Sequence, residues 1–210
     1  MKQINPFDHY ALEYDLWFDE HPLVYSLELS AIKELLPQRG VGIEVGAGTG
    51  RFAQPLGISL AVEPSEAMRE IAVIRGVNII DGVAESLPFK NDSYDFVLMV
   101  TTVCFLKQPE LAFKEAHRVL KTDGCIVIGI IDRESRLGKK YAENQRSSKF
   151  YKDAHFYSAQ EIQQKLLKSG FKMIQSVQAI LPGDNIKGTK VKSGYGEGSF
   201  VVIKAVKSQS

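Results

Sequence analysis

The sequence has little cysteine, almost no net charge and no long apolar run, and each shortage excludes a class of protein. Two cysteines in 210 residues make no disulfide framework, so Cys104 and Cys125 are expected to be buried thiols in a reducing compartment. A formal net charge of +1 provides no basic field for nucleic acid or for an anionic membrane. No window reaches the roughly 18 consecutive apolar residues of a membrane span, and the N-terminus lacks the apolar core of a signal peptide. We therefore expect a cytoplasmic protein without nucleic-acid or membrane partners.

Metal-ligand spacing and internal repeats are also missing. The four histidines are His9, His21, His117 and His155. Their separation matches no metal motif, so no metal is expected. With 44% apolar residues, the length suits a single α/β domain. We expect a helical cap over residues 1–36, a central core over residues 40–131, and a loop, helix and C-terminal strands over residues 132–210.

A glycine-rich segment over residues 41–51 is the most informative feature. Its apolar run carries one acid, Glu44, and then breaks into alternate glycines, Gly46, Gly48 and Gly50. Apolar residues that run into glycine predict a buried strand ending in a tight turn. Glycine lets the backbone pass close to a ligand. Because open α/β sheets bind ligands at the carboxyl ends of their strands, this segment predicts a small-molecule cofactor site.

The glycine spacing discriminates between cofactors. A dinucleotide site needs Gly-x-Gly-x-x-Gly, and a P-loop ends in Gly-Lys followed by Ser or Thr, whereas position 51 is Arg51. The pattern that remains, Glu-x-Gly-x-Gly-x-Gly, resembles the first motif of the class I S-adenosylmethionine-dependent methyltransferases, of the small-molecule, methyltransferase-11-like type. Two alternatives stay open. One is a nicotinamide-dependent oxidoreductase on a similar sheet, and the other is a non-catalytic module that binds S-adenosylmethionine.

A second apolar strand over residues 58–62 ends in an acid, Glu63. An acid at the tip of the second strand can accept hydrogen bonds from both ribose hydroxyls, as in dinucleotide sites. Pro64 follows directly, and Ser65 is a good N-cap for a helix that Gly76 can end. Residues 58–76 therefore predict a strand, a ribose-binding acid and a helix in succession.

The segment over residues 81–89 resembles the adenine loop of the same family. By that resemblance, the backbone near Ala84 and the side of Glu85 face the adenine edge. Val83 stands where the family commonly has an aspartate that accepts a bond from the adenine amino group, and Asp81 is the nearest acid. Backbone groups are then left to recognise the adenine.

Later segments continue the resemblance in family order. Residues 92–100 look like the fourth strand, and Thr101 follows where the family places the transferred methyl and the substrate. A helix from Pro109 leads into a fifth strand over residues 125–131. Together these imply a Rossmann-like α/β fold: a seven-stranded, mostly parallel sheet with helices on both faces and an antiparallel C-terminal hairpin.

The two ends of the chain supply the candidates for the substrate side. By resemblance, the aromatic N-terminal helix is a lid over the cofactor, and Tyr14 contacts the methionine carboxylate or the substrate. Residues 132–157 read as a long non-periodic loop, which is usually functional. His155 lies in this loop and becomes a candidate base if the acceptor must lose a proton.

The sequence thus predicts an enzyme that transfers a methyl group from S-adenosylmethionine to a small-molecule acceptor by in-line displacement. The expected cofactor-binding residues are Glu44, Gly46, Ala47, Gly48, Glu63, Pro64, Val83, Ala84, Glu85 and Thr101. Transfer from a sulfonium requires alignment and exclusion of water rather than a nucleophile or a metal, so no catalytic pair stands out beyond the candidates Tyr14 and His155. The acceptor atom and the oligomeric state stay open.

Overall fold

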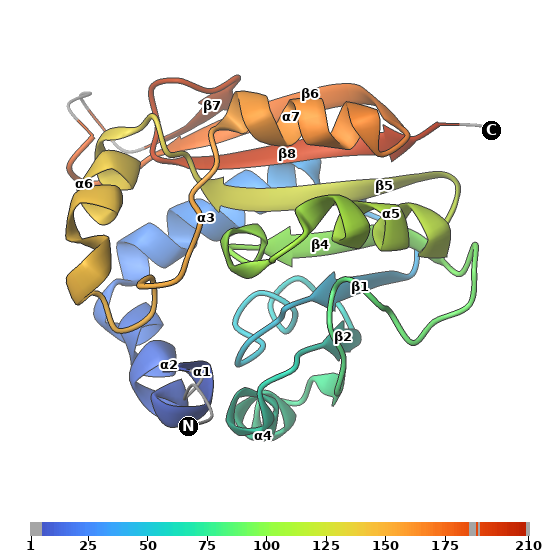
Figure 1. Ribbon diagram of the computed structural model, residues 1–210, viewed down its shortest axis with the longest axis horizontal. Coiled ribbons are helices and arrows are strands. Elements are labelled where there is room, and N and C mark those ends of the chain that lie inside the picture. The colour runs from blue at the N-terminus through green and yellow to red at the C-terminus, as the bar shows by residue number, and fades with distance from the viewer. Residues whose placement is uncertain (1–5, 185–187, 189, 209–210) are drawn as a thin grey trace.

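One eight-stranded sheet organises the part of the chain that the computed structural model describes, residues 6–184, 188 and 190–208 (Figure 1). The strands are β1 (Gly42–Val45), β2 (Leu60–Val62), β3 (Asn78–Ile80), β4 (Tyr94–Val100), β5 (Leu120–Ile131), β6 (Phe171–Ile180), β7 (Lys190–Ser193) and β8 (Phe200–Lys207). The α-helices are α1 (Pro6–His9), α2 (Ala11–Glu20), α3 (Pro22–Leu35), α4 (Glu66–Ile74), α5 (Pro109–Val119), α6 (Arg136–Asn144) and α7 (Ala159–Lys168). Two short 3-10 helices are η1 (Val103–Phe105) and η2 (Gln145–Ser147).

The strand order is β3-β2-β1-β4-β5-β8-β6-β7. Strands β3, β2, β1, β4 and β5 run parallel to one another, whereas β8 runs antiparallel to both β5 and β6. The α/β class, the parallel core and the antiparallel C-terminal pair are confirmed, but the expected count of seven strands is wrong. The eighth, β7, pairs with β6 over Val177–Ile180. It has only four residues and one apolar side chain, so its pairing is tertiary and leaves no local pattern.

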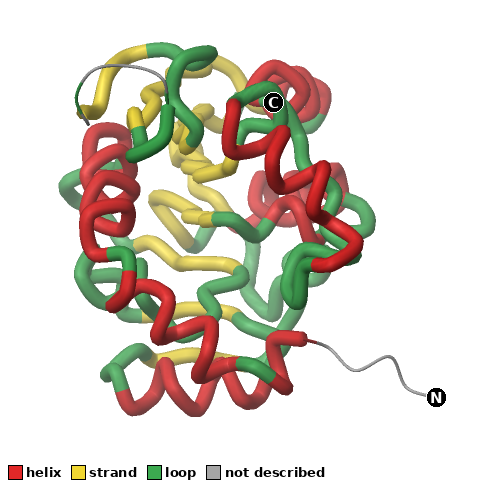
Figure 2. Tube along the Cα trace, turned by 90° about the vertical axis from the view of Figure 1, so that its left-hand side faces the viewer, coloured by secondary structure: helices red, strands yellow, loops and turns green. Residues whose placement is uncertain are grey.

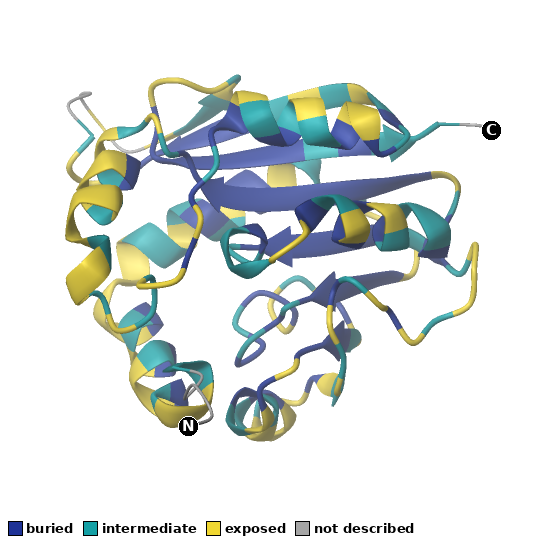
Figure 3. Cartoon of the chain, in the orientation of Figure 1, coloured by how far each residue is buried: buried dark blue, intermediate teal, exposed yellow. Residues whose placement is uncertain are grey.

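Helices cover both faces of the sheet, which Figure 2 shows nearly edge-on. Helices α5 and α7 pack on one face, and α2, α3 and α4 pack on the other. Alternate residues of β5 divide between the two layers, with Ile126 and Ile128 in one core and Cys125 and Val127 in the other. The central strands are buried almost throughout (Figure 3), as expected for a parallel sheet covered on both sides.

Several helix boundaries follow the sequence signals. The Ser65 hydroxyl accepts from the backbone N–H of Met68, and Ser158 forms a complete capping box with Glu161 at the start of α7. Residues 132–157 differ from the expected loop because they contain α6, which is capped by the Ser135 hydroxyl. Its only buried residue is a glycine, so its sequence lacks the apolar period by which buried helices are recognised. Over the described ranges, no helix is both long and apolar enough to cross a membrane.

Candidate active site

The candidate site lies where the strand order reverses, between the carboxyl ends of β1 and β4, which is where open α/β sheets bind ligands. The loop after β1 contains the alternate glycines, and the end of β4 brings Thr102 against it. The Thr102 hydroxyl lies 3.1 Å from the Gly46 carbonyl oxygen and 3.0 Å from that of Val100. A Cβ atom on Gly46 would lie 2.3 Å from the Thr102 methyl carbon. Gly46 is therefore required by packing, a role that the sequence did not reveal.

Gly48, unlike Gly46, has open space where a side chain would lie. Its φ is +54°, and a Cβ atom would meet only the Tyr14 ring, at 3.6 Å. Its backbone N–H donates to the Glu63 carboxylate over 2.9 Å. The neighbouring Ala47 is buried, and its backbone N–H bonds to the end of β2. The loop thus forms a cradle in which a ligand can approach the backbone at Gly48.

Glu63 lies at the tip of β2 as expected, and it is 7% exposed. One carboxylate oxygen accepts from Gly48 and the other from the Ser65 backbone N–H, each over 2.9 Å. Burial raises the pKa of Glu63, and these two bonds partly offset the rise. A carboxylate can accept about four hydrogen bonds, so capacity for a ribose diol remains. Glu63 therefore supports the loop as well as presenting an acceptor, while Pro64 beside it is exposed.

Glu44 is buried within β1 with an unsatisfied oxygen. It is 1% exposed, and its Oε2 atom has no hydrogen-bond partner. Burial raises the pKa of this carboxyl well above its ordinary value, and the charge of Glu63 adds to the rise. An unpaired buried acceptor is costly, and a donor supplied by a ligand, such as an amino group, would satisfy it.

Thr101 closes the other side of the site. Its φ is +49°, a strained value for a β-branched residue and of a kind that concentrates at functional sites. Its backbone N–H is fixed by the Gly129 carbonyl at 2.8 Å. Burial raises the pKa of the Tyr14 phenol, and a hydrogen bond with the Thr101 side chain partly offsets this. Tyr14 therefore stays neutral and links the N-terminal cap to both the Gly48 cradle and Thr101.

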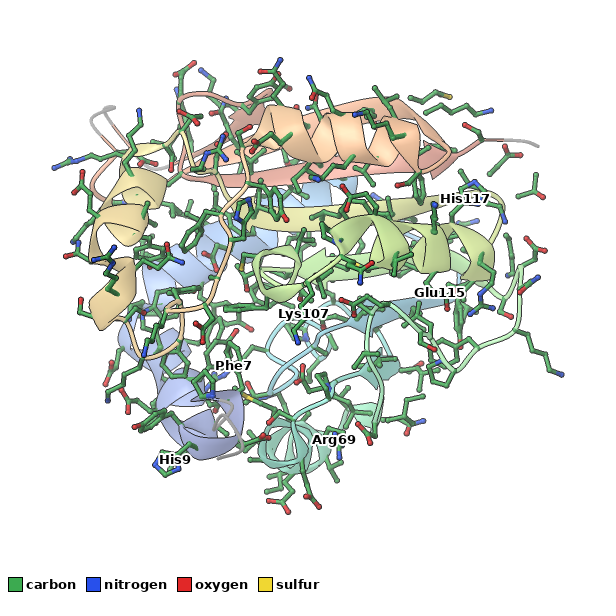
Figure 4. The ribbon with its side chains drawn as sticks, viewed as in Figure 1. Phe7, His9, Arg69, Lys107, Glu115 and His117 are labelled. Atoms are coloured by element: carbon green, nitrogen blue, oxygen red, sulfur yellow. The ribbon has the colours of Figure 1, made fainter. Side chains whose placement is uncertain are left out.

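The expected adenine loop forms a small turn beyond β3. Val83 and Ser86 bridge, Val83 is 46% exposed, and Ala84 is buried. Glu85 is half-buried in the same turn. The nearby acid Asp81 is exposed and pairs with Arg69 of α4 at 3.1 Å, and Figure 4 labels Arg69 there. Asp81 is thus held by a neighbouring helix rather than presented as the replacement for the missing aspartate.

His155 is not among the residues that line a small pocket beside Thr101. Its side chain is exposed, its ring packs on Tyr157 at 4.5 Å, and its backbone N–H donates to the Cys104 carbonyl at 2.7 Å. The pocket has a volume of about 10 Å³ and is lined by Thr101, Cys104, Ile130, Ile131, Tyr151, Phe156 and Tyr157. Burial raises the pKa of the Cys104 thiol to about 12, which keeps it protonated and unreactive. Among the described residues, no group of His, Cys, Asp and Glu side chains is arranged to hold a metal ion.

An ion-pair network beneath the glycine loop was not anticipated from the sequence. Asp15 of α2 is 8% exposed and accepts from both Arg51 and Arg75 at 2.7–2.8 Å. Arg51 also pairs with Asp19, and Arg75 donates to the Thr49 carbonyl of the loop. The network fastens the N-terminal cap to the loop. The only signal in the sequence was Arg51 itself, in place of a dinucleotide-type glycine.

These features fit the ligand that the sequence suggests. The unsatisfied oxygen of Glu44 suits an amino group, the open backbone at Gly48 suits close approach, and Glu63 retains acceptor capacity for a ribose. The three groups belong to β1, the loop after it and β2, and so they converge on one side of the switch point.

Comparisons with known proteins agree with this geometry. The family described as "Methyltransferase domain" matches residues 43–128. An uncharacterized protein of Methanocaldococcus jannaschii is 48% identical over 205 residues, which cover 97% of this chain and 100% of that protein. A chloroplastic 2-methyl-6-phytyl-1,4-hydroquinone methyltransferase of rice is 28% identical over 174 residues, and the match spans 72% of this chain but about half of that protein, 48%.

A solved structure is similar over nearly the whole length. It is described as a "SAM-dependent methyltransferase, possible histamine N-methyltransferase" of Thermotoga maritima. It has a TM-score of 0.91 and 48% identity, and the match covers 96% of this chain and 98% of that one. The site geometry and these relatives show together that the chain is an enzyme that uses S-adenosylmethionine and that it belongs to the class I S-adenosylmethionine-dependent methyltransferases.

Proposed function

We propose that this methyltransferase acts on a small-molecule acceptor by in-line displacement. The observation that carries the proposal is the small pocket beside Thr101, at the carboxyl end of β4, since Tyr14 contacts both Thr101 and the Gly48 cradle. Its volume of about 10 Å³ has room for about one water molecule, so an acceptor must enter by displacing side chains. A site of this kind suits a small molecule better than a macromolecular surface.

The chain's residues supply alignment and shielding rather than a nucleophile. S-adenosylmethionine, when bound, supplies a methyl group activated on a sulfonium sulfur. Glu44, Gly48 and Glu63 would hold its two ends, and Tyr14 would cover it from the N-terminal cap. An aromatic face favours a nearby positive charge. Thr101 would fix the edge of the acceptor pocket, and the side chains around it would exclude water.

Two further observations support a small acceptor. The net charge of +1 gives no overall basic field for nucleic acid. The description of the Thermotoga maritima relative names histamine, which is a small molecule.

The test is transfer of labelled methyl from S-adenosylmethionine into a cell extract that has been separated by size. We expect label in the low-mass fraction. Label found only in the protein or nucleic-acid fraction would contradict a small-molecule acceptor while leaving the methyltransferase assignment intact.

Replacing the acid at the tip of β2 tests the cofactor site directly. The Glu63→Ala variant should bind S-adenosylhomocysteine more weakly by about 1.5–3 kcal/mol, because a charged hydrogen-bond acceptor is lost. Calorimetry measures the effect. The matched control is Asp81→Ala, at the exposed acid that pairs with Arg69, and it should bind normally. Equal affinities for the two variants would remove Glu63 from the site.

A further inference from the structure

Glu115 and Arg118 form an ion pair on α5 that the proposed function leaves unused, and Figure 4 labels Glu115 on that helix. The Arg118 guanidinium donates to both carboxylate oxygens of Glu115, each over 2.7 Å. The bond from Arg118 lowers the pKa of the Glu115 carboxyl, so the pair is ionised at neutral pH. Both side chains are partly exposed, and such pairs stabilise a fold only slightly. The further bonds that the two side chains make are therefore more informative than the pair itself.

The pair fastens the irregular segment between β3 and β4. Leu87 is held through both of its backbone groups, since its N–H donates to Glu115 over 2.9 Å and its carbonyl accepts from Arg118 over 3.0 Å. Arg118 also donates to the Phe89 carbonyl over 2.7 Å and to the Asn91 side chain over 2.9 Å. One guanidinium and one carboxylate thus fix the downstream half of the segment to α5.

The upstream end of the same segment lies against the end of β2. The Glu63 N–H donates to the last carbonyl of β3 over 3.1 Å. A Cβ atom on Gly82 would lie 2.9 Å from a Val62 methyl carbon, so the chain passes directly against β2. Arg69 of α4 bonds both to the Glu63 carbonyl and to Asp81, over 2.9 and 3.1 Å. A nucleoside whose ribose is held by the Glu63 carboxylate would therefore have its base beside this segment.

A turn with unpaired backbone donors lies between these two attachments. The Ser86 N–H donates to the Val83 carbonyl over 3.1 Å, which closes a β-turn around Ala84 and Glu85. Over the described part of the chain, the N–H groups of Ala84 and Glu85 donate no hydrogen bond. The side chains of Val83 and Ala84 have no polar atom, so the turn must recognise a base mainly through its backbone.

We propose that Glu115 and Arg118 are positioning residues that set the selectivity for adenine, by fixing the turn over residues 83–86 against the base of the cofactor. Backbone N–H groups cannot reorient as side chains do, so their selectivity depends on where the chain is held. An N–H donor suits the N1 acceptor of adenine, whereas hypoxanthine has an N1–H donor at the same position. Selection of the cofactor's base is separate from selection of the acceptor, and it therefore goes beyond the proposed function.

The experiment measures the affinities of the full chain for S-adenosylhomocysteine and S-inosylhomocysteine by calorimetry. The two ligands differ only in the base, where the 6-amino group of adenine is replaced by the 6-oxo group of hypoxanthine. We expect the wild type to bind S-adenosylhomocysteine about 100-fold or more tightly, because two facing donors are both left unpaired.

Two variants of the pair should reduce this ratio of affinities at least about tenfold, since each releases the turn. Glu115→Ala removes the acceptor of the Leu87 N–H. Arg118→Lys keeps the charge and disturbs the fold less, but an ammonium lacks the planar fork that holds two carbonyls and a carboxylate together. The matched control is Glu110→Ala, at an acid of the same helix that pairs with Lys165 of α7 instead, and it should keep the wild-type ratio.

The ratio distinguishes positioning from a purely structural role. Partial unfolding weakens the binding of both ligands by the same factor and leaves their ratio unchanged. The proposal is overturned if the wild type binds the two ligands equally, or if Arg118→Lys keeps the wild-type ratio. A ratio that falls as far in Glu110→Ala as in the variants of the pair would also overturn it.

Discussion

A valine at position 48 should abolish cofactor binding and leave a folded protein. Gly48 has a φ of +54°, and its missing side chain leaves the cradle open, with only the Tyr14 ring nearby at 3.6 Å. A branched side chain would fill the volume through which a ligand approaches the backbone. We expect the affinity for S-adenosylhomocysteine, measured by calorimetry, to fall at least about 100-fold, or ~2.7 kcal/mol.

The chain offers a matched control for backbone strain. Gly57 has a φ of +69° and nothing within 4 Å of the position of its Cβ atom. The Gly57→Val variant therefore introduces the same kind of left-handed strain as Gly48→Val, but far from any proposed ligand contact. It should bind normally and show similar circular dichroism. Equal loss of binding in both variants would mean that strain, rather than occupation of the cradle, causes the effect.

Removal of the Asp15 carboxylate should be the most destabilising change outside the hydrophobic core. Asp15 is 8% exposed and holds two guanidinium groups, from the glycine loop and from the end of α4. Loss of one partner from a buried ion pair leaves uncompensated charge, which costs about 3–5 kcal/mol. Because Arg51 still pairs with Asp19 in the Asp15→Ala variant, we expect the free energy of unfolding to fall by about 3 kcal/mol. Calorimetry should then show an unfolding temperature lower by about 6–12 °C.

The neighbouring acid provides the control for this change. Asp19 contacts the same guanidinium but its side chain is 60% exposed, so Asp19→Ala should alter stability little. Similar losses for the two variants would contradict a special role for the buried carboxylate.

The stability difference between the wild type and Asp15→Ala should also depend on pH. Burial would raise the pKa of Asp15, but the bonds from Arg51 and the charge of Arg75 outweigh it, so the pKa lies below the ordinary value. A lowered pKa means that the folded state favours the ionised form. The contribution is therefore complete above the ordinary aspartate pKa of about 4 and is lost as pH falls through the lower, folded value. Denaturant unfolding at neutral and acidic pH should show the difference shrinking only in acid.

Local sequence patterns were enough to predict the fold and the cofactor. The strand–glycine pattern at residues 41–51, the acid after β2 and the capping signals at Ser65 and Ser158 depend on neighbouring residues alone, so the sequence contains them explicitly. Family membership removes the support for an oxidoreductase and for a non-catalytic module.

Side-chain roles were less predictable, because they depend on contacts between distant segments. Gly46 is required by Thr102, which follows β4, and Glu63 supports Gly48 as well as presenting an acceptor. His155, which was expected as a candidate base, has an exposed side chain and does not line the pocket. The strand β7 was missed because its four residues acquire their conformation only by pairing with β6.

The sequence by itself determined the parallel α/β core, the cofactor class and the positions at which strands end in ligand-binding turns. Periodicity, glycine spacing and capping depend on residues that are close together in the sequence, so they can be recognised without the structure. Only the tertiary structure decided that Asp15 pairs with Arg51 and Arg75, and that Thr102 packs against Gly46. Burial and pairing of charge depend on which surfaces meet when the sheet and helices pack, and no local pattern records that.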